Sequence, residues 1–171
     1  MDVAADPPEA AAARPVDKGP RVWLIGESNP YSDDPRYALY PLPERASGGR
    51  LCRILGLTSR DYLRTFERRD LLSTARWSVP QARVAAAALL HEVGAGDALV
   101  LCGGKVAAAF GFEYAALAAH TTATGHAALV IPHPSGLNRQ WSATPGLAAR
   151  VREAVMALVR AQKESAACPT S

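Results

Sequence analysis

The stretch that decides the fold reads RVWLI over residues 21–25 and stops at Gly26. It is a short apolar run without the alternation of polar and apolar residues that marks a half-exposed strand. Two more runs of this kind follow, DALVLC at 97–102 and AALVI at 127–131. Strands that are apolar on both faces are typical of a parallel sheet covered by helices on both sides. The three runs therefore predict such a sheet.

The intervals between the runs carry helix signals. Segments beginning near Ser47, Ser78 and Thr144 start with a small polar residue and continue with alanine, leucine or valine at helical spacing. Because strands and helices alternate, the order predicts an α/β fold, a three-layer α/β/α sandwich. With a further strand expected at 66–72, the sheet has four parallel strands.

Length and composition set the domain organisation. The 171 residues, 49% hydrophobic and 20% charged, are those of one globular domain. Residues 1–20 are rich in proline and alanine without apolar periodicity, so we expect a flexible arm, followed by the domain at 21–163 and a tail at 164–171. No apolar run approaches the roughly 18 residues of a membrane span, and no basic, apolar leader is visible. We expect a cytoplasmic protein without a membrane partner.

Cysteines and charge exclude several other classes. Cys52, Cys102 and Cys168 are far apart and form no Cys-x-x-Cys pair, which argues against a disulfide framework, a zinc ribbon or an iron-sulfur cluster. We expect no metal and no cofactor. The net charge of +3 suits a nucleic-acid partner, although many cytosolic enzymes carry as much.

Polar loops follow all three apolar runs, at the strand ends where ligands bind in open parallel sheets. In the last loop two prolines fix the backbone around His133, while Ser135 and Gly136 expose amides suited to a phosphate that Arg139 would steady. A rigid surface turn is the simpler explanation of such a loop, but its position at a strand end favours function. The glycines of Gly103-Gly104-Lys105 lack P-loop spacing and more readily explain a close helix start.

Several motifs occur together in a recognisable order. They are Gly26-Glu27-Ser28-Asn29-Pro30-Tyr31, Gly48-Gly49-Arg50-Leu51, the apolar run with Gly103 and Gly104, and His133-Pro134-Ser135-Gly136-Leu137. From Arg21 to about Trp141 the chain thus resembles the uracil-DNA glycosylase superfamily. The resemblance implies a monomer that receives a nucleotide flipped out of DNA and hydrolyses its N-glycosidic bond without a metal. The base would be uracil or another deaminated or modified base.

The resemblance also implies catalytic roles. Asn29 would position the attacking water, and His133 would donate a hydrogen bond to the leaving base as its negative charge grows. The first loop has one residue more than the family's usual Gly-x-Asn-Pro. Either Asn29 or Glu27 therefore faces the water, and Asp33 and Asp34 are further carboxylates in the same loop.

Other residues would bind the base. Tyr31 would form the pocket wall where thymine's methyl group would lie, and Tyr40, or else Tyr37, would stack on the base. Asp70 lies where the family usually has the asparagine that reads uracil; since an ionised aspartate only accepts hydrogen bonds, we expect weak uracil excision. Alternatively, Asp70 caps a turn or pairs with a neighbouring arginine. The remaining substrate-binding candidates are Gly26, Ser28 and Pro30.

The DNA-binding candidates lie in the last loop. Ser135 and Gly136 would hold the flanking phosphates and Leu137 would enter the gap left by the flipped base. The same set includes Asn138 and Arg139. Arg68 and Arg69 are either further phosphate contacts or a solvated charge cluster.

Two rival functions use the same residues. A module on this fold could bind a nucleobase or single-stranded nucleic acid without cleaving it. A serine hydrolase built on Ser135 and His133 is disfavoured, because no Gly-x-Ser-x-Gly elbow is present. The residues favour neither single- nor double-stranded DNA.

Overall fold

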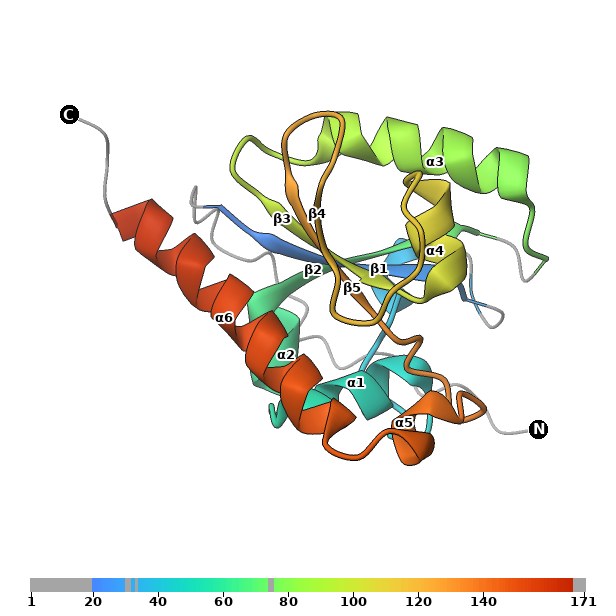
Figure 1. Cartoon of the computed structure of the whole chain (residues 1–171), viewed down its shortest axis with the longest axis vertical. Coiled ribbons are helices and arrows are strands. Elements are labelled where there is room, and N and C mark those ends of the chain that lie inside the picture. Colours follow the sequence, from blue (N-terminus) through green and yellow to red (C-terminus); the bar gives the residue numbers. More distant parts are fainter. Residues whose placement is uncertain (1–19, 30–31, 33, 74–75, 168–171) are drawn as a thin grey trace.

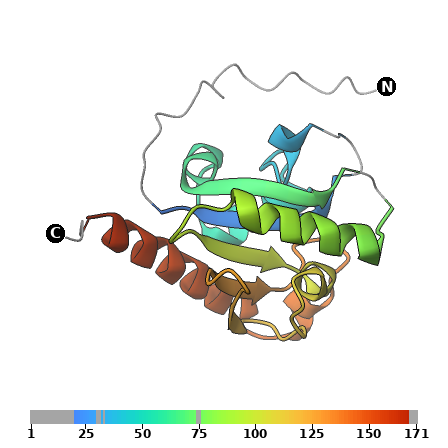
Figure 2. The same cartoon turned by 90° about the horizontal axis from the view of Figure 1, so that it is seen from above.

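The computed structural model describes residues 20–29, 32, 34–73 and 76–167, and Figure 1 shows their arrangement. One sheet has the strand order β2-β1-β3-β5-β4. Its strands are β1 (Val22–Ser28), β2 (Phe66–Leu72), β3 (Ala98–Cys102), β4 (Ala119–Thr121) and β5 (Ala127–Ile131). The neighbours β2-β1, β1-β3 and β3-β5 are parallel. Figure 2 shows the strands stacked from β2 to β5 in this order.

The sheet corrects the expected four-stranded parallel arrangement. It has five strands and is mixed, because β4 pairs antiparallel with β5. A tight turn joins the two: the Thr122 amide donates to the His126 carbonyl at 2.9 Å, and Gly125 has φ +87°. A turn this short connects only antiparallel strands. The general α/β class is confirmed, and so is the strand expected at 66–72.

Helices cover both faces of the sheet. One face packs on α3 (Val79–Glu92) and α4 (Gly104–Ala109), the other on α1 (Ser47–Leu55), α2 (Ser59–Thr65) and α6 (Leu147–Ala167). Figure 1 shows α3 and α6 on opposite sides of the sheet. The short elements η1 (Pro35–Tyr37) and α5 (Gln140–Ala143) lie in the connecting loops.

The packing of β1 explains why its sequence does not alternate between polar and apolar residues. Val22 and Leu24 pack with α1 and α6, while Trp23 and Ile25 pack with α3 and α4, and all four are buried. Both faces of the strand therefore need apolar side chains.

The helix α6 buries one apolar face against the sheet. Leu147, Val151, Val155 and Val159 are buried, while Leu158 is only partly buried against the same core. The helix includes residues 164–167, which are exposed. None of the described helices is long and apolar enough to cross a membrane.

A buried carboxylate ties β1 to β3 at their amino ends. Asp97 is 4% exposed and accepts hydrogen bonds from the Trp23 indole at 2.8 Å and from the Arg21 amide at 2.7 Å. A third bond comes from the Gly94 amide at 3.1 Å. These donors satisfy a charge that would otherwise be costly to bury.

Candidate functional site at the carboxyl edge of the sheet

The four parallel strands end at one edge, and most of the predicted site residues lie there. Glu27 is the penultimate residue of β1 and Asp70 lies opposite Gly26 near the end of β2. Gly103 follows β3 and His133 comes two residues after β5. Parallel topology therefore gathers these residues from segments far apart in the sequence.

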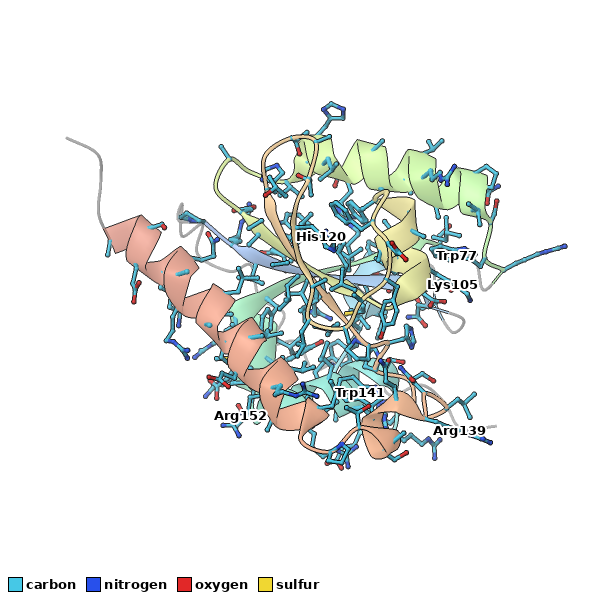
Figure 3. The ribbon with its side chains drawn as sticks, viewed as in Figure 1. Trp77, Lys105, His120, Arg139, Trp141 and Arg152 are labelled. Atoms are coloured by element: carbon cyan, nitrogen blue, oxygen red, sulfur yellow. The ribbon has the colours of Figure 1, made fainter. Side chains whose placement is uncertain are left out.

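Glu27, Lys105 and His133 form one cluster. The Lys105 Nζ lies 3.1 Å from Glu27 Oε2, and His133 Nε2 lies 3.9 Å from Glu27 Oε1. The Lys105 ammonium also lies 5.7 Å from the centre of the Trp77 ring, and Figure 3 shows these two side chains near α4. The carboxylate thus lies between a cation and an imidazole, which gives Glu27 a fixed orientation.

The His133 ring is held as a neutral hydrogen-bond donor. Its Nδ1 accepts from the Ser135 amide at 3.1 Å, so in the neutral ring the proton is on Nε2. Burial lowers the pKa of His133, and the nearby Lys105 lowers it further against the opposing effect of Glu27. At neutral pH the side chain therefore presents an N–H from Nε2 to its surroundings.

Three side chains fix the loop that carries His133. The His133 carbonyl accepts from the Trp141 indole at 2.8 Å and from Asn138 Nδ2 at 3.0 Å. Arg50 donates from Nε to the Pro134 carbonyl at 3.1 Å. The side chain of Asn138, which was predicted to bind DNA, forms a hydrogen bond within this loop. Trp141 and Arg50 had no predicted role, although both lie within the segment that carries the resemblance.

Gly103 lets the His133 loop approach β3. Its φ is +105°, and a Cβ atom built on it would lie 3.0 Å from the Cβ of His133. A side chain here would strain the backbone and displace the imidazole. The sequence analysis expected these glycines to allow a close helix start and did not foresee His133 as the neighbour of Gly103.

The tip of the same loop projects outward. The Leu137 side chain is 91% exposed, and Ser135 Oγ accepts from the Leu137 amide at 3.2 Å. Gly136 and Arg139 are also exposed, and Figure 3 shows Arg139 at the surface beside α5. The loop therefore presents an apolar side chain and a cation to the outside on a fixed backbone.

The loop after β1 is described only in part. Pro30, Tyr31 and Asp33 lie outside the described residues. Asn29 donates from Nδ2 to the Tyr37 carbonyl at 3.3 Å. Asp34 accepts from the Arg36 amide at 2.9 Å and pairs with its guanidinium at 2.7 Å, so it caps η1.

The aromatic candidates Tyr40 and Tyr37 lie together. Their ring centres are 5.7 Å apart, edge to face. The Arg68 guanidinium lies 5.6 Å from the Tyr40 ring and donates to the Ala38 carbonyl at 2.8 Å. Arg69 pairs with Glu92 at 2.7 Å. Both arginines thus have partners within the protein, and Arg68 holds the loop that carries the tyrosines.

Asp70 is among the residues that line a hollow of about 360 Å³ between the loop after β1, β2 and α3, and its carboxylate lies over Gly26 beside Leu39. Asn29, Asp34, Arg69 and Glu92 also line it. Burial raises the pKa of Asp70 to about 6, with Arg68 lowering it and Glu27 raising it. A Cβ on Gly26 would collide with this carboxylate, so the glycine makes room for it. Glu27 and His133 do not line the hollow.

Among the described residues, no group of three or more His, Cys, Asp or Glu side chains could hold a metal ion. No family model matches the chain, and a search of the curated proteins gives no match. The fold and site thus define an α/β protein with a cluster of polar groups at the carboxyl edge of a mixed sheet.

Proposed function

We propose that this protein is a metal-independent DNA glycosylase of the uracil-DNA glycosylase type. It hydrolyses the N-glycosidic bond of a flipped-out deaminated or modified base, acts as a monomer and works in the cytoplasm. The observation that carries the proposal is the neutral His133 ring, held at the strand edge with Nε2 as its donor.

His133 stabilises the departing base. When the N-glycosidic bond breaks, the electron pair stays on the base and negative charge grows on its oxygen. A hydrogen bond from Nε2 that is already aimed at that oxygen costs no reorganisation during the reaction. The bonds from Trp141 and Asn138 to the His133 carbonyl support this fixed position.

Glu27 is the group that activates the water. Its carboxylate lies beside the His133 Nε2, where it can take a proton from water attacking the sugar carbon. Lys105 holds the carboxylate in place through the contact at 3.1 Å. Asn29, two residues after Glu27, donates to the Tyr37 carbonyl and lines the hollow, and it positions the water.

The exposed loop tip contacts the DNA. Leu137 is almost fully exposed on a backbone that three side chains hold, which suits an apolar wedge between bases. Ser135 and Gly136 supply amides for a phosphate, and Arg139 supplies a positive charge.

The test is base excision by the purified full chain. Labelled oligonucleotides containing uracil, hypoxanthine, xanthine or hydroxymethyluracil are incubated with the protein, and abasic sites are cleaved with alkali. We expect strand cleavage with at least one base, and cleavage roughly 100-fold or more slower with the His133→Ala variant.

A non-catalytic nucleobase-binding module is the second candidate. One observation favours it: the hollow that Asp70 and Asn29 line does not include Glu27 or His133. Binding of the same oligonucleotides without any abasic product would support this candidate against the enzyme.

A further inference from the structure

Asp70 is a half-buried carboxyl group that lies over Gly26 at the rim of the hollow and has no side-chain partner among the described residues. Among the described residues, no hydrogen bond or ion pair reaches its oxygens, although most other carboxylates of the site are paired. Gly26, opposite on β1, leaves the space that the group fills. An unpaired carboxylate in such a place costs stability, and a ligand with N–H groups would satisfy it.

The charged and titratable side chains near Asp70 form their hydrogen bonds and ion pairs with other groups. On β2, Arg68 donates to the Ala38 carbonyl, and on β1, Glu27 pairs with Lys105. On α2, Tyr62 donates its hydroxyl proton to the Leu39 carbonyl at 3.0 Å. Burial raises the pKa of the Cys102 thiol on β3, so it stays neutral.

Across the hollow the remaining charges are also paired. Asp34 binds Arg36, and Arg69 binds Glu92 on α3. No cation in the described part of the site forms an ion pair with Asp70; Arg68, bonded to backbone carbonyls, acts on it only as a nearby charge. The carboxylate of Asp70 can accept hydrogen bonds from a ligand that carries N–H groups.

We propose that Asp70 selects a base whose edge carries two adjacent N–H donors, as the N1–H and exocyclic amine of a guanine-type base do. This rests on the proposed function only in that the ligand is a nucleobase. An ionised carboxylate has acceptors alone and takes two parallel N–H bonds. Uracil offers one donor and one acceptor, so its O4 would face a carboxylate oxygen. The hollow of about 360 Å³ is within the usual range for ligand pockets.

The inference fixes the sign of a pH effect. A two-donor edge binds the ionised carboxylate, so guanine-type binding tightens as pH rises through the Asp70 pKa of about 6. A protonated carboxyl has one donor and one acceptor and suits uracil. Uracil-type binding therefore tightens as pH falls over the same range.

The experiment measures nucleoside binding to the full chain by isothermal titration calorimetry. The ligands are 2′-deoxyguanosine, 2′-deoxyinosine, which lacks only the exocyclic amine, and 2′-deoxyuridine, each at pH 5 and pH 7.5. We expect deoxyguanosine to bind about tenfold or more tightly than the other two at the higher pH. Asp70→Asn should reverse the order of deoxyguanosine and deoxyuridine and remove the pH effect.

Glu92→Gln is the matched control. It makes the same carboxylate-to-amide change in the same hollow, at a residue already paired with Arg69. It should leave the order of the three ligands unchanged. If Asp70→Asn does not fold, the opposite pH trends of deoxyguanosine and deoxyuridine in the native chain carry the test.

Three results would overturn the inference: deoxyuridine binding as tightly as deoxyguanosine at pH 7.5, a preference that survives Asp70→Asn, or no nucleoside binding. Selective guanine-type binding without any base excision would leave the inference standing and contradict the glycosylase proposal. Uracil excision that Asp70→Asn does not change, without a preference for deoxyguanosine, would contradict this inference and support the glycosylase proposal.

Discussion

The loop that carries His133 is held mainly through the His133 carbonyl, while the imidazole accepts one hydrogen bond, from the Ser135 amide. His133→Ala should lower the single-turnover rate of base excision by roughly 100-fold or more, because a preorganised donor to the developing charge is lost. The melting temperature should change little, since the loop is held through the His133 carbonyl. Loss of stability with unchanged excision per folded molecule would contradict a catalytic role.

The His133 ring should set the acidic limb of the pH–rate profile of base excision. Because burial lowers the pKa of His133 below its ordinary value of 6.5, the neutral donor persists through mildly acidic pH. Excision should therefore fall only as the pH drops below that value. A titration of the imidazole by NMR, compared with the pH–rate profile, checks this. A rate that declines already from pH 8 to pH 7 on protonation of the ring would contradict it.

The contribution of Asp70 to the free energy of unfolding should depend on pH in the opposite sense to that of a paired carboxylate. Its pKa is raised from 3.8 to about 6, so the native state binds the proton more tightly than the unfolded state does. Stability is then lost as pH rises from about 4 to 6 and stays lower above that. Asp70→Asn should raise the free energy of unfolding at pH 7.5 by up to about 3 kcal/mol and much less at pH 4. Urea unfolding at both pH values measures the difference, and equal effects would show that Asp70 is solvated.

At the scale of secondary-structure elements, the exposed tip of the loop between β5 and α5 should affect the proposed contact with DNA without affecting stability. Leu137 is 91% exposed, so Leu137→Ala should leave the melting temperature unchanged. It should slow excision from duplex DNA more than from single strands, since only the duplex has a stack to hold open. Equal losses on both substrates would remove the wedge role.

Removing the Asp97 side chain, which links β1 to β3, should lower stability without slowing excision. Asp97→Ala leaves the Trp23 indole and two backbone amides without their acceptor, at a cost of about 1–3 kcal/mol or more in unfolding free energy. Excision per folded molecule should persist, because the residue lies at the amino ends of the strands. Chemical denaturation with an activity assay separates the two effects.

On the scale of the whole molecule, the strands buried on both faces were the predictable part. β1, β3 and β5 coincide with the three apolar runs, since helices cover both sides of each. β4 was missed because Ala119–Thr121 is short and largely exposed, and its pairing with β5 leaves no apolar signature.

The site was predictable in position but not in its pairings. Topology places Glu27, Asp70 and His133 at one edge, as the strand ends indicated. The inward turn of Arg68 onto the Ala38 carbonyl depends on a loop that folds back over β2, which no local pattern reveals. The pairing of Lys105 with Glu27 likewise joins residues from two different strand ends.

These pairings leave few cations for a DNA backbone. The logarithm of the affinity should fall with the logarithm of salt concentration with a slope of about −0.9 per phosphate bound. Arg139→Gln should reduce that slope by about one contact. Arg150→Gln on α6, also exposed, is the control and should not change it. Binding that does not depend on salt would point to a free nucleobase as the ligand.

The two outer strands of the sheet also differ in how readily each would pair with another chain. An uncovered outer strand presents unpaired amides and carbonyls to any passing chain. β5 is apolar and would be adhesive, but the three residues of β4 cover it and present a short, mostly exposed border instead. At the other border, β2 carries the charged run Glu67-Arg68-Arg69-Asp70. Removing the β4 hairpin would therefore expose β5, the more aggregation-prone of these strands, so this short segment shields an apolar strand from other chains.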